Sequence, residues 1–440
     1  MKLIAGLLSS KSGFIIFAII YSFTYNFLYN NYLIVYFAYI SDLNPTGLSG
    51  YPLFFYYTLS TIPLFFFRGF KTLAAGMSFM VYLLIYIPCL HSVLVSDFLS
   101  IDSCITLTIA LFISIILYFI TDGVYIGKNF FLLSKQKFSF RFVFFLTLIL
   151  LSVVLFSYAG KIRFVNFFVE KTSLLYEMRA EASSDRSAIL AYLAKWLKGA
   201  FIPLCLVYGL ASKNKVVIIS MFGAYFLMFM TDYQKITFLM PFIIYGTYLL
   251  AKTPHKSNFY FPNQIIIICI ALGWIAYMIC GSSIGFTISS IIILRTLHCE
   301  EWLMTMYMDF FENHPYTYYS HINIVNYFAE NYPYDFSLGY AVTNNSFNAN
   351  ACFIITDGLA SLGSTGIFII SVVFVLFKAF YNTISLRYNK MVIFVMMLPV
   401  IVAFLNVSLF TSILTSGFGM LYLILLFTRL PKIENQRYIN

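Results

Sequence analysis

Long runs of apolar residues alternate with short polar segments along most of this 440-residue chain. A helix needs about 20 apolar residues to cross the hydrocarbon core of a bilayer. Ile, Phe and Leu fill the runs without strict alternation, which favours helices over the short alternating strands of a membrane β-barrel. About twelve runs reach this length, over residues 13–40, 51–67, 72–90, 103–121, 142–159, 197–211, 216–231, 236–251, 264–283, 362–382, 391–409 and 411–428. The pattern predicts an all-α, polytopic integral membrane protein in which residues 1–440 form a single membrane domain.

The composition agrees with this prediction and excludes a soluble enzyme. Hydrophobic residues make up 61% of the chain and charged residues only 10%, with a mean hydropathy of +0.86, whereas soluble domains carry roughly 25% charged residues. No short apolar segment followed by a small-residue cleavage site opens the chain, so we expect the first span to be retained as an anchor. The seven cysteines form no CxxC pair, and we interpret them as small apolar residues without a metal or disulfide role.

The net charge of +10 raises the question of nucleic-acid binding, but the distribution of the charges argues against it. Basic residues form short clusters between the apolar runs, for example Lys378, Arg387 and Lys390. This spacing is typical of the positive-inside rule, in which cytoplasmic loops collect Lys and Arg. With an even number of spans, it predicts that both termini lie in the cytoplasm. We therefore predict that the chain lies in a lipid bilayer and binds no nucleic acid.

Two longer polar segments depart from this pattern, over residues 160–196 and 284–350. Both fall on the outer side of the predicted topology, although the first is rich in Lys and Arg. Basic residues on the outer face run against the positive-inside rule, so they indicate a local role. Because both loops face the same compartment, we expect them to contribute to one shared site.

Arginines in the two loops are the first candidates for a binding role. Arg179 and Arg186 are seven residues apart, which places them on one face of a helix, and Arg295 directly follows the apolar run 291–294. The planar guanidinium suits bidentate contact with phosphate oxygens, so these residues could hold a lipid pyrophosphate and stabilise it as a leaving group. The alternative is that Arg179 forms an ion pair with a neighbouring glutamate and has no further role. Lys235 lies in an outer turn and either adds a phosphate contact or extends to the membrane surface.

Acidic residues in the second loop are candidates for a general base. Asp309 and Glu312 are three residues apart, so on a helix both point to one side, and either could deprotonate an attacking hydroxyl. Glu300 and Glu301 belong to the same set, and the alternative for all four is plain solvation. Asp357 differs because it enters a predicted span next to Gly358, where a charge needs a partner or a function. We list Asp357 among the substrate-binding candidates, and a structural role, as a helix cap or in locking a re-entrant turn, fits it as well as a catalytic one.

The histidines of the second loop show no metal-binding pattern. His298, His314 and His321 lack HxH or HExxH spacing, so we predict no metal and no cofactor. Loop hydrogen bonds or contact with a sugar are the expected roles, with His314 the candidate for substrate binding. Tyrosines and phenylalanines are dense around Tyr319, and such rings either line the membrane surface or stack on sugar faces.

Read in order along the second half of the chain, these residues resemble the Wzy-type O-antigen polymerases, the oligosaccharide repeat-unit polymerases. The segments that carry the resemblance are Tyr176-Glu177-Met178-Arg179, Lys235, Arg295, the run 307–315, Tyr318-Tyr319-Ser320, residues 332–334 and 338–340, Asn348-Ala349-Asn350 and Asp357-Gly358 with Gly363 and Gly366. Residues 1–150 carry only the hydropathy expected of such a protein.

The resemblance implies an inner-membrane glycosyltransferase that is similar in design to the GT-C type. Residues 160–196 and 284–350 would be its large periplasmic loops, and the active site would face the periplasm. Its substrates would be undecaprenyl-pyrophosphate-linked oligosaccharides, joined during lipopolysaccharide biosynthesis, with a separate co-polymerase controlling chain length. Family arginines correspond to Arg179 and Arg295 here, with Arg186 and Lys235 as further contacts and Asn348 and Asn350 among the substrate-binding candidates.

Three other functions remain open on the sequence alone. An O-antigen ligase would use the same donor but a different acceptor. A lipid-linked-oligosaccharide flippase or other transporter would be expected to carry charges near mid-membrane and two symmetric halves, while here the charges gather in two dissimilar outer loops. A non-catalytic scaffold would leave those arginines without a role.

Overall fold

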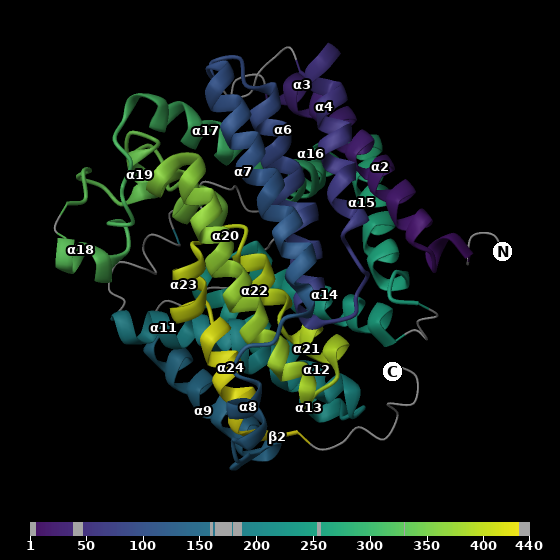
Figure 1. Cartoon of the computed structure of the whole chain (residues 1–440). Helices are drawn as coiled ribbons and strands as arrows, with labels where there is room; N and C mark the ends of the chain where they lie inside the picture. Colours follow the sequence, from purple (N-terminus) through teal and green to yellow (C-terminus); the bar gives the residue numbers. More distant parts are fainter. Residues whose placement is uncertain are drawn as a thin grey trace. The chain divides into compact units, whose positions relative to one another are not determined.

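The computed structural model describes residues 6–37, 47–158, 162, 178, 187–252, 257–329 and 331–430 (Figure 1). Helices account for 78% of the structure. The only sheet within these ranges is a pair of two-residue parallel strands, β1 (Phe138–Ser139) and β2 (Thr428–Arg429). The predicted all-helical character is therefore confirmed.

Nine helices of the described chain are long and apolar enough to cross a membrane. They are Lys11–Tyr36, Leu73–Val95, Ile101–Gly123, Phe140–Ser157, Ala188–Ala211, Lys215–Asp232, Tyr260–Ile279, Ile354–Leu386 and Leu409–Phe427. Each coincides with one of the twelve predicted runs, which identifies the chain as a membrane protein of the polytopic helical kind.

The other three predicted runs form shorter or interrupted helices. The run at 51–67 becomes α4 (Gly50–Thr61) and the 3₁₀ turn η2 (Ile62–Phe65), and the run at 391–409 is divided between α21 (Lys390–Met396) and α22 (Leu398–Ala403). A proline lies at the start of both η2 and α22, where its missing N–H and fixed φ favour a new helical start over continuation. The run at 236–251 is α14 (Lys235–Lys252), which has Pro241 inside and a lysine at each end.

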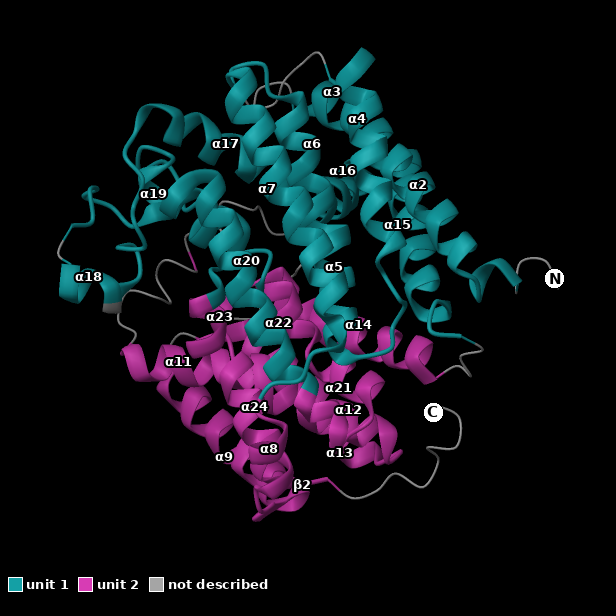
Figure 2. Ribbon diagram, viewed as in Figure 1, with its two compact units in different colours: residues 1–126, 255–382, 404–409 teal, residues 127–254, 383–403, 410–440 magenta. Residues whose placement is uncertain are grey.

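The chain forms two compact units, coloured separately in Figure 2. Unit 1 comprises residues 1–126, 255–382 and 404–409. Its elements are α2 (Lys11–Leu28), η1 (Tyr29–Leu33), α3 (Ile34–Tyr36), α4, η2, α5 (Leu73–Val81), η3 (Tyr82–Tyr86), α6 (Ile87–Val95), α7 (Ile101–Ile120), η4 (Thr121–Gly123), α15 (Tyr260–Ile279), α16 (Ser283–Ser289), η6 (Ser290–Leu297), α17 (Cys299–Asn313), α18 (Asn323–Ala329), α19 (Leu338–Ala341), η7 (Ile354–Leu359) and α20 (Ala360–Asn382).

Unit 2 comprises residues 127–254, 383–403 and 410–440. Its elements are α8 (Lys128–Leu133), β1, α9 (Phe140–Ser157), α11 (Ala188–Trp196), η5 (Leu197–Phe201), α12 (Ile202–Ala211), α13 (Lys215–Asp232), α14, η8 (Thr383–Leu386), α21, α22, α23 (Leu409–Leu414), α24 (Phe418–Phe427) and β2. The first residue of α23 belongs to unit 1.

Short polar side chains begin many of these helices. Each accepts a hydrogen bond from a backbone N–H of the first turn, which satisfies one of the donors that a helix leaves open at its N-terminus. The caps are Ser10, Thr72, Ser100, Ser139, Ser187, Asn214, Ser282 and Asn389. The polar residues between the apolar runs therefore determine where the helices start.

A buried ion pair joins two spans of unit 1. Lys378 of α20 is completely buried, and its Nζ donates to Asp122 Oδ1 at 2.7 Å and to Ser78 Oγ at 3.0 Å. Asn382 adds a hydrogen bond from its Nδ2 to the Asp122 carbonyl at 2.8 Å. The sequence placed Lys378 in a basic cluster on the cytoplasmic side, which stays a prediction, and the structure shows that its side chain is buried against the Asp122 carboxylate. A buried charge of this kind persists only with a partner.

The start of α20 is kinked at a glycine. Leu362 and Gly363 leave helical geometry, and Gly363 has a φ of +61°. A Cβ at this position would lie 2.8 Å from the Tyr316 hydroxyl, so both the backbone conformation and the close approach require glycine. The kink brings Tyr316 against the beginning of α20.

Candidate functional site

Residues 283–313 of unit 1 form a helical hairpin that turns back along α15; we call it the returning hairpin. Ser290, at the start of η6, lies 3.3 Å from the Tyr32 hydroxyl near the end of the first span. His298, at its turn, stacks on Tyr25, seven residues earlier in that span, with 3.8 Å between ring centroids. Leu297 packs near Gly273 of α15. The segment therefore runs back from the end of α15 before α17 returns outward.

Arg295 lies on the inward-running arm of this hairpin. Its side chain is exposed, and no hydrogen bond or ion pair joins it to another described residue. The geometry places Arg295 back along α15 from the end of that helix, and its predicted position at or just above the membrane surface stays a prediction. The level of Gly273 is six residues before Ile279, about 9 Å at the rise of an α-helix. An exposed arginine without a partner among the described residues is available for contact with an anionic ligand.

A fully buried carboxylate forms the centre of the hairpin turn. Glu301 is 0% exposed, and its Oε2 accepts from the Tyr25 hydroxyl and from His298 Nδ1, both at 2.7 Å. Its Oε1 bonds to His91 Nδ1, and the other ring nitrogen of His91 lies 3.0 Å from Asn26 Oδ1. One turn further, Thr305 contacts Ser92 at 2.8 Å. We call Tyr25, Asn26, His91, His298 and Glu301 the Glu301 cluster.

The charges in this cluster follow from its partners. Burial alone would raise the pKa of Glu301, but His91 and His298 outweigh it and lower the pKa to about 2. Burial lowers the pKa of His298, which favours its neutral form. Both carboxylate oxygens are occupied by hydrogen bonds, and no group of His, Cys, Asp and Glu in the described chain could hold a metal ion. The cluster therefore anchors α17 to α2 and α6.

The neighbouring Glu300 is buried in a different environment. Its Oε2 accepts from the Cys352 backbone N–H at 3.0 Å, while its Oε1 is buried without a partner in the described structure. Burial raises the pKa of Glu300 well above its usual value. Through the hydrogen bond from Cys352, Glu300 ties α17 to the segment before η7.

A small cleft opens at the other end of α17, and we call it the α17 cleft. It has a volume of about 90 Å³. Its walls are Leu99, Ser103, Thr106 and Leu107 around the start of α7, Met308, Phe311 and Glu312 of α17, Tyr316, and Leu359 and Ser364 at the kink. One carboxylate and four hydroxyls thus surround two aromatic rings, those of Phe311 and Tyr316, which stack with centroids 5.7 Å apart. Carboxylates and hydroxyls are partners for the hydroxyl groups of a sugar.

Asp357 supports one wall of this cleft. It is completely buried, and its Oδ2 accepts from the Leu409 backbone N–H at 2.6 Å, while His321 Nε2 lies 3.2 Å from Oδ1. The other ring nitrogen of His321 lies 3.0 Å from Thr317 Oγ1, and the Thr317 N–H donates to the Ala360 carbonyl. Asp357 therefore fixes the turn that follows Tyr316, which supports the structural alternative considered for it.

Tyr319 lies beside this carboxylate. Burial, with the charge of Asp357 as a second cause, raises the pKa of Tyr319. Its hydroxyl is buried and has no hydrogen-bond partner in the described structure. Its backbone is left-handed with a φ of +64°, a strained conformation of the kind found at functional turns.

The remaining predicted residues are dispersed. Asp309 is exposed on α17, and His314 stacks on Phe310 with centroids 4.0 Å apart, its Nδ1 donating to the Phe310 carbonyl. Asn348 and Asn350 are exposed in the loop before η7. Lys235 is the first residue of α14 in unit 2. Arg179 and Arg186 lie outside the described residues.

The structure separates Arg295 from Glu312. The first precedes α17 and the second lies near its end, and a 15-residue helix is about 22 Å long. A general base has to lie within hydrogen-bond reach of the proton it removes. Arg295 and Glu312 therefore cannot act on the same bond while α17 stays intact, so the two residues require different roles.

The sequence analysis did not identify Tyr25, Asn26 and His91 as partners of Glu301. A histidine inside a 94%-buried span was one signal, because an intramembrane ionisable residue needs a partner. The spacing of His298 and Glu301, three residues apart on a helix, was another. Neither signal identifies the other helix that meets them.

Comparison of the chain with protein families, with curated proteins and with solved structures found no match.

Proposed function

We propose that the protein is a membrane glycosyltransferase of the O-antigen polymerase kind, which joins undecaprenyl-pyrophosphate-linked oligosaccharide repeat units at the outer face of the bacterial inner membrane. The observation that carries the proposal is Arg295, an exposed arginine that lies back along α15 and has no hydrogen bond or ion pair to another described residue. Such a residue suits a pyrophosphate whose lipid lies in the membrane.

In the proposed reaction, a sugar hydroxyl of the acceptor attacks the anomeric carbon of the donor glycan. A new carbon–oxygen bond forms there as the bond from that carbon to the pyrophosphate oxygen breaks. The hydroxyl proton is released to water, and undecaprenyl pyrophosphate leaves with the electron pair. The guanidinium of Arg295 stabilises the negative charge that grows on the leaving pyrophosphate.

The α17 cleft takes the role of a saccharide subsite in this proposal. It lies about 22 Å along α17 from Arg295, so a glycan extending outward from the pyrophosphate could reach Glu312 and Tyr316. Leu99 and Ser103 place the cleft at the same end of the α6–α7 pair as Asp97 and Asp102. The charge pattern assigns these acids to the outer face, which supports an outward-facing site. A general base at Asp309 or elsewhere stays a prediction.

The test is replacement of Arg295 in a strain of the source organism that lacks the chromosomal gene. Arg295→Ala should abolish the polymer ladder on a lipopolysaccharide gel and leave core with a single repeat unit. Arg295→Lys should restore little of it, because lysine is a point charge without the planar fork.

Arg141→Ala is the matched control, since Arg141 is another exposed arginine, at the start of α9. It should leave the ladder unchanged. Membrane levels of all variants are measured by immunoblot. A full ladder in Arg295→Ala at normal protein level would contradict the role of Arg295, and loss of every repeat in the deletion strain would indicate a ligase or a flippase instead.

A further inference from the structure

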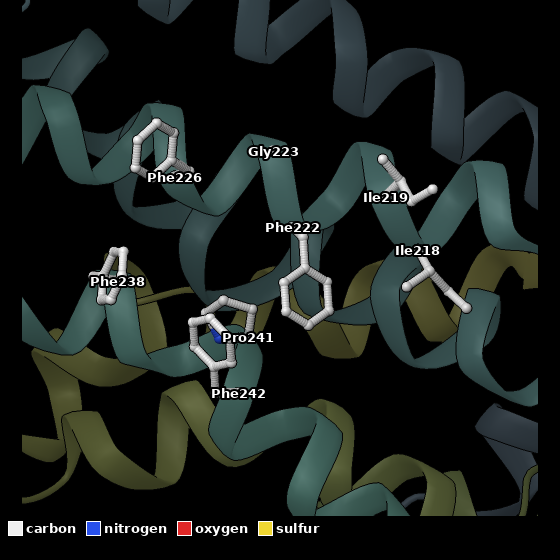
Figure 3. Close-up of a pocket in the computed structure, with 8 residues that line it drawn as sticks. All are labelled: Ile218, Ile219, Phe222, Gly223, Phe226, Phe238, Pro241 and Phe242. Carbon is white, nitrogen blue, oxygen red and sulfur yellow. The ribbon is translucent and has the colours of Figure 1, made fainter.

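The α17 cleft is too small to hold more than a fragment of a glycan. Its volume is about 90 Å³, whereas pockets for small molecules enclose about 300–1,000 Å³. A larger cavity of about 430 Å³ lies between α13 and α14 of unit 2, but its walls are apolar side chains such as Ile218, Phe222 and Phe242 (Figure 3). Because sugar hydroxyls need hydrogen-bond partners, a glycan that enters the α17 cleft continues over the surface beside it.

Aromatic rings form a continuous path from the cleft onto that surface. Phe311 and Tyr316 are walls of the cleft. Tyr334 lies next to Phe311, with ring centroids 6.4 Å apart, and Tyr332 lies next to Tyr334, with centroids 5.6 Å apart. We call these four residues the aromatic track. Tyr316, Tyr332 and Tyr334 are half-buried, so part of each side chain is open to a ligand.

The sequence explains why the two rings furthest from the cleft lie side by side. Pro333 restricts the residue before it, Tyr332, to an extended backbone, and residues 331–334 are in neither a helix nor a strand. Side chains two residues apart in an extended chain point to the same side. Tyr332 and Tyr334 therefore present their rings together, in agreement with the 5.6 Å between their centroids.

Hydrogen bonds hold these two rings in place. The Tyr334 hydroxyl donates to the Pro315 carbonyl, and the Tyr332 hydroxyl donates to the Phe336 carbonyl at 2.9 Å. Burial raises the pKa of both hydroxyls to about 12, so both remain protonated donors at neutral pH. A ring that is already held loses little conformational freedom when a ligand stacks on it. The aromatic track is thus a preorganised surface.

The charges around the track indicate what covers it. From residue 296 to residue 377 the sequence contains acids, among them Asp309, Glu312 and Asp335, and neither Lys nor Arg. An acidic surface repels the phosphates of anionic lipids and of nucleic acids. Aromatic rings beside carboxylates suit a neutral glycan, whose apolar C–H faces stack on the rings while its hydroxyls donate to the carboxylates.

We infer that the aromatic track binds the growing polysaccharide beyond the α17 cleft and retains it between additions. The inference rests on the proposed function and deepens it by naming the ligand as a neutral, extended glycan. The reducing end of the donor glycan changes lipid at each transfer, whereas the repeats further along it are unchanged. A track that holds these repeats keeps the polymer on the enzyme while undecaprenyl pyrophosphate leaves and the next acceptor binds, so longer retention gives longer chains.

Binding of free polysaccharide tests this inference without turnover. The ligand is the polysaccharide released by mild acid from the lipopolysaccharide of the source strain, and the full-length protein is held in lipid nanodiscs. Wild-type protein should bind it, and Tyr334→Leu or Tyr332→Leu should weaken binding about tenfold, as expected for the loss of one stacked ring. Tyr334→Phe keeps the ring and should bind more tightly than Tyr334→Leu. Equal binding by wild type and both leucine variants would overturn the inference.

Tyr327→Leu is the matched control. Tyr327 lies on α18 of the same unit, is 78% exposed, and contacts the ring of Phe328 outside the track. This variant should bind the polysaccharide as the wild type does, and thermal unfolding of all variants shows whether each is folded. If a leucine variant does not fold, hydroxyl-radical footprinting of the wild type decides. The polysaccharide should protect Tyr332 and Tyr334 from oxidation and leave Tyr327 reactive, and equal oxidation with and without polysaccharide would overturn the inference.

The polymer ladder separates this inference from the proposed function. Tyr334→Leu should shorten the ladder, whereas Arg295→Ala should leave a single repeat. A full-length ladder in Tyr334→Leu would overturn retention by the track alone. A shorter ladder from a protein that binds no polysaccharide would also overturn the inference and assign the track to a protein partner. An unaltered ladder in the deletion strain would contradict the proposed function, and the binding measurement does not depend on that result.

Discussion

The two ends of α17 carry four acids with opposite environments. Glu300 and Glu301, in the first turn, are buried and bonded to other helices, whereas Asp309 and Glu312, in the last turns, are exposed. The sequence treats all four as candidates for one role. The comparison shows that one helix uses its acids in two ways: the buried end secures the helix, and the open end faces a cleft.

The same contrast applies to the helix dipole. Acids in a first turn are favoured by the positive N-terminal end, and an acid in the last turn opposes the negative C-terminal end. Glu301 thus lies where the dipole, two histidines and Tyr25 all favour a carboxylate. Glu312 lies where no described side chain pairs with it and the dipole disfavours it. A disfavoured acid at the wall of a cleft indicates selection for binding rather than for stability.

The largest expected effect comes from removing the buried acid. Glu301→Ala leaves His91 and His298 without their partner and should destabilise the protein by about 3–5 kcal/mol, as for other broken buried pairs. The measurement is thermal unfolding of purified protein in detergent, with yield of monodisperse protein as a second readout. Asp309→Ala on the same helix is the control and should shift stability by less than about 0.5 kcal/mol. Equal shifts in the two variants would contradict the assigned difference between the ends.

Acid pH should lower the stability of the folded protein, as Glu301→Ala does, because it affects the same buried end of α17. Glu301 has a pKa of about 2 in the folded protein against 4.5 for the free group. The depressed value adds stability that is complete above pH 4.5 and is lost as the pH falls from there through 2. His298 has a lowered pKa, so the unfolded chain takes up its proton first, and stability also falls as the pH drops through 6.5.

Unfolding at pH 7.5, pH 4.5 and pH 2.5 measures the two losses separately. His298→Asn keeps a donor for Glu301 without a titrating ring, so it should remove the part of the loss that begins near pH 6.5 and leave the part below pH 4.5. A wild-type protein that is as stable at pH 4.5 as at pH 7.5 would contradict the lowered pKa of His298, and one that is as stable at pH 2.5 as at pH 4.5 would exclude the ionised state assigned to Glu301.

A smaller effect is expected from one hydroxyl of the cluster. Tyr25→Phe removes the 2.7 Å hydrogen bond to Glu301 and keeps the ring stacked on His298. Hydrogen bonds to charged groups contribute about 1.5–3 kcal/mol, so the melting temperature should fall less than in Glu301→Ala. Tyr36→Phe, at a 41%-exposed tyrosine on the same span, should change little. A Tyr25→Phe protein as stable as the Tyr36→Phe protein would remove Tyr25 from the cluster.

Hydropathy predicted most of the spans because a membrane-spanning helix can be recognised from the length and apolar composition of its own sequence. The nine candidate spans all fall on predicted runs. Hydropathy did not predict the returning hairpin, since residues 284–350 contain enough polar side chains to resemble a loop. It also did not predict the burial of Lys378, because the lysine is compensated by Asp122, 256 residues away in the chain. Long-range pairing of this kind leaves no trace in a local window.

The candidate site shows the same division. Residue types suggested phosphate contact for Arg295 and an open acid at Glu312, and both side chains are indeed exposed. Their separation by the length of α17 could not be predicted, because it depends on where that helix starts. The support of Tyr316 by Asp357 and His321 depends on a kink at Gly363 that pattern analysis does not reveal.

The smallest change in stability should accompany a loss of function at the open end. Glu312→Gln removes a charge that opposes the dipole of α17 and leaves the side-chain volume nearly unchanged, so stability should rise by about 0.3–1 kcal/mol. If the α17 cleft binds the saccharide, the same variant should shorten the polymer ladder, because an amide accepts fewer hydrogen bonds from sugar hydroxyls than a carboxylate. Gln136→Glu, the reverse exchange at an exposed residue of unit 2, should leave the ladder intact. An unchanged ladder in Glu312→Gln would show that Glu312 is a solvated surface acid. The exposed end of α17 would then have no role in saccharide binding.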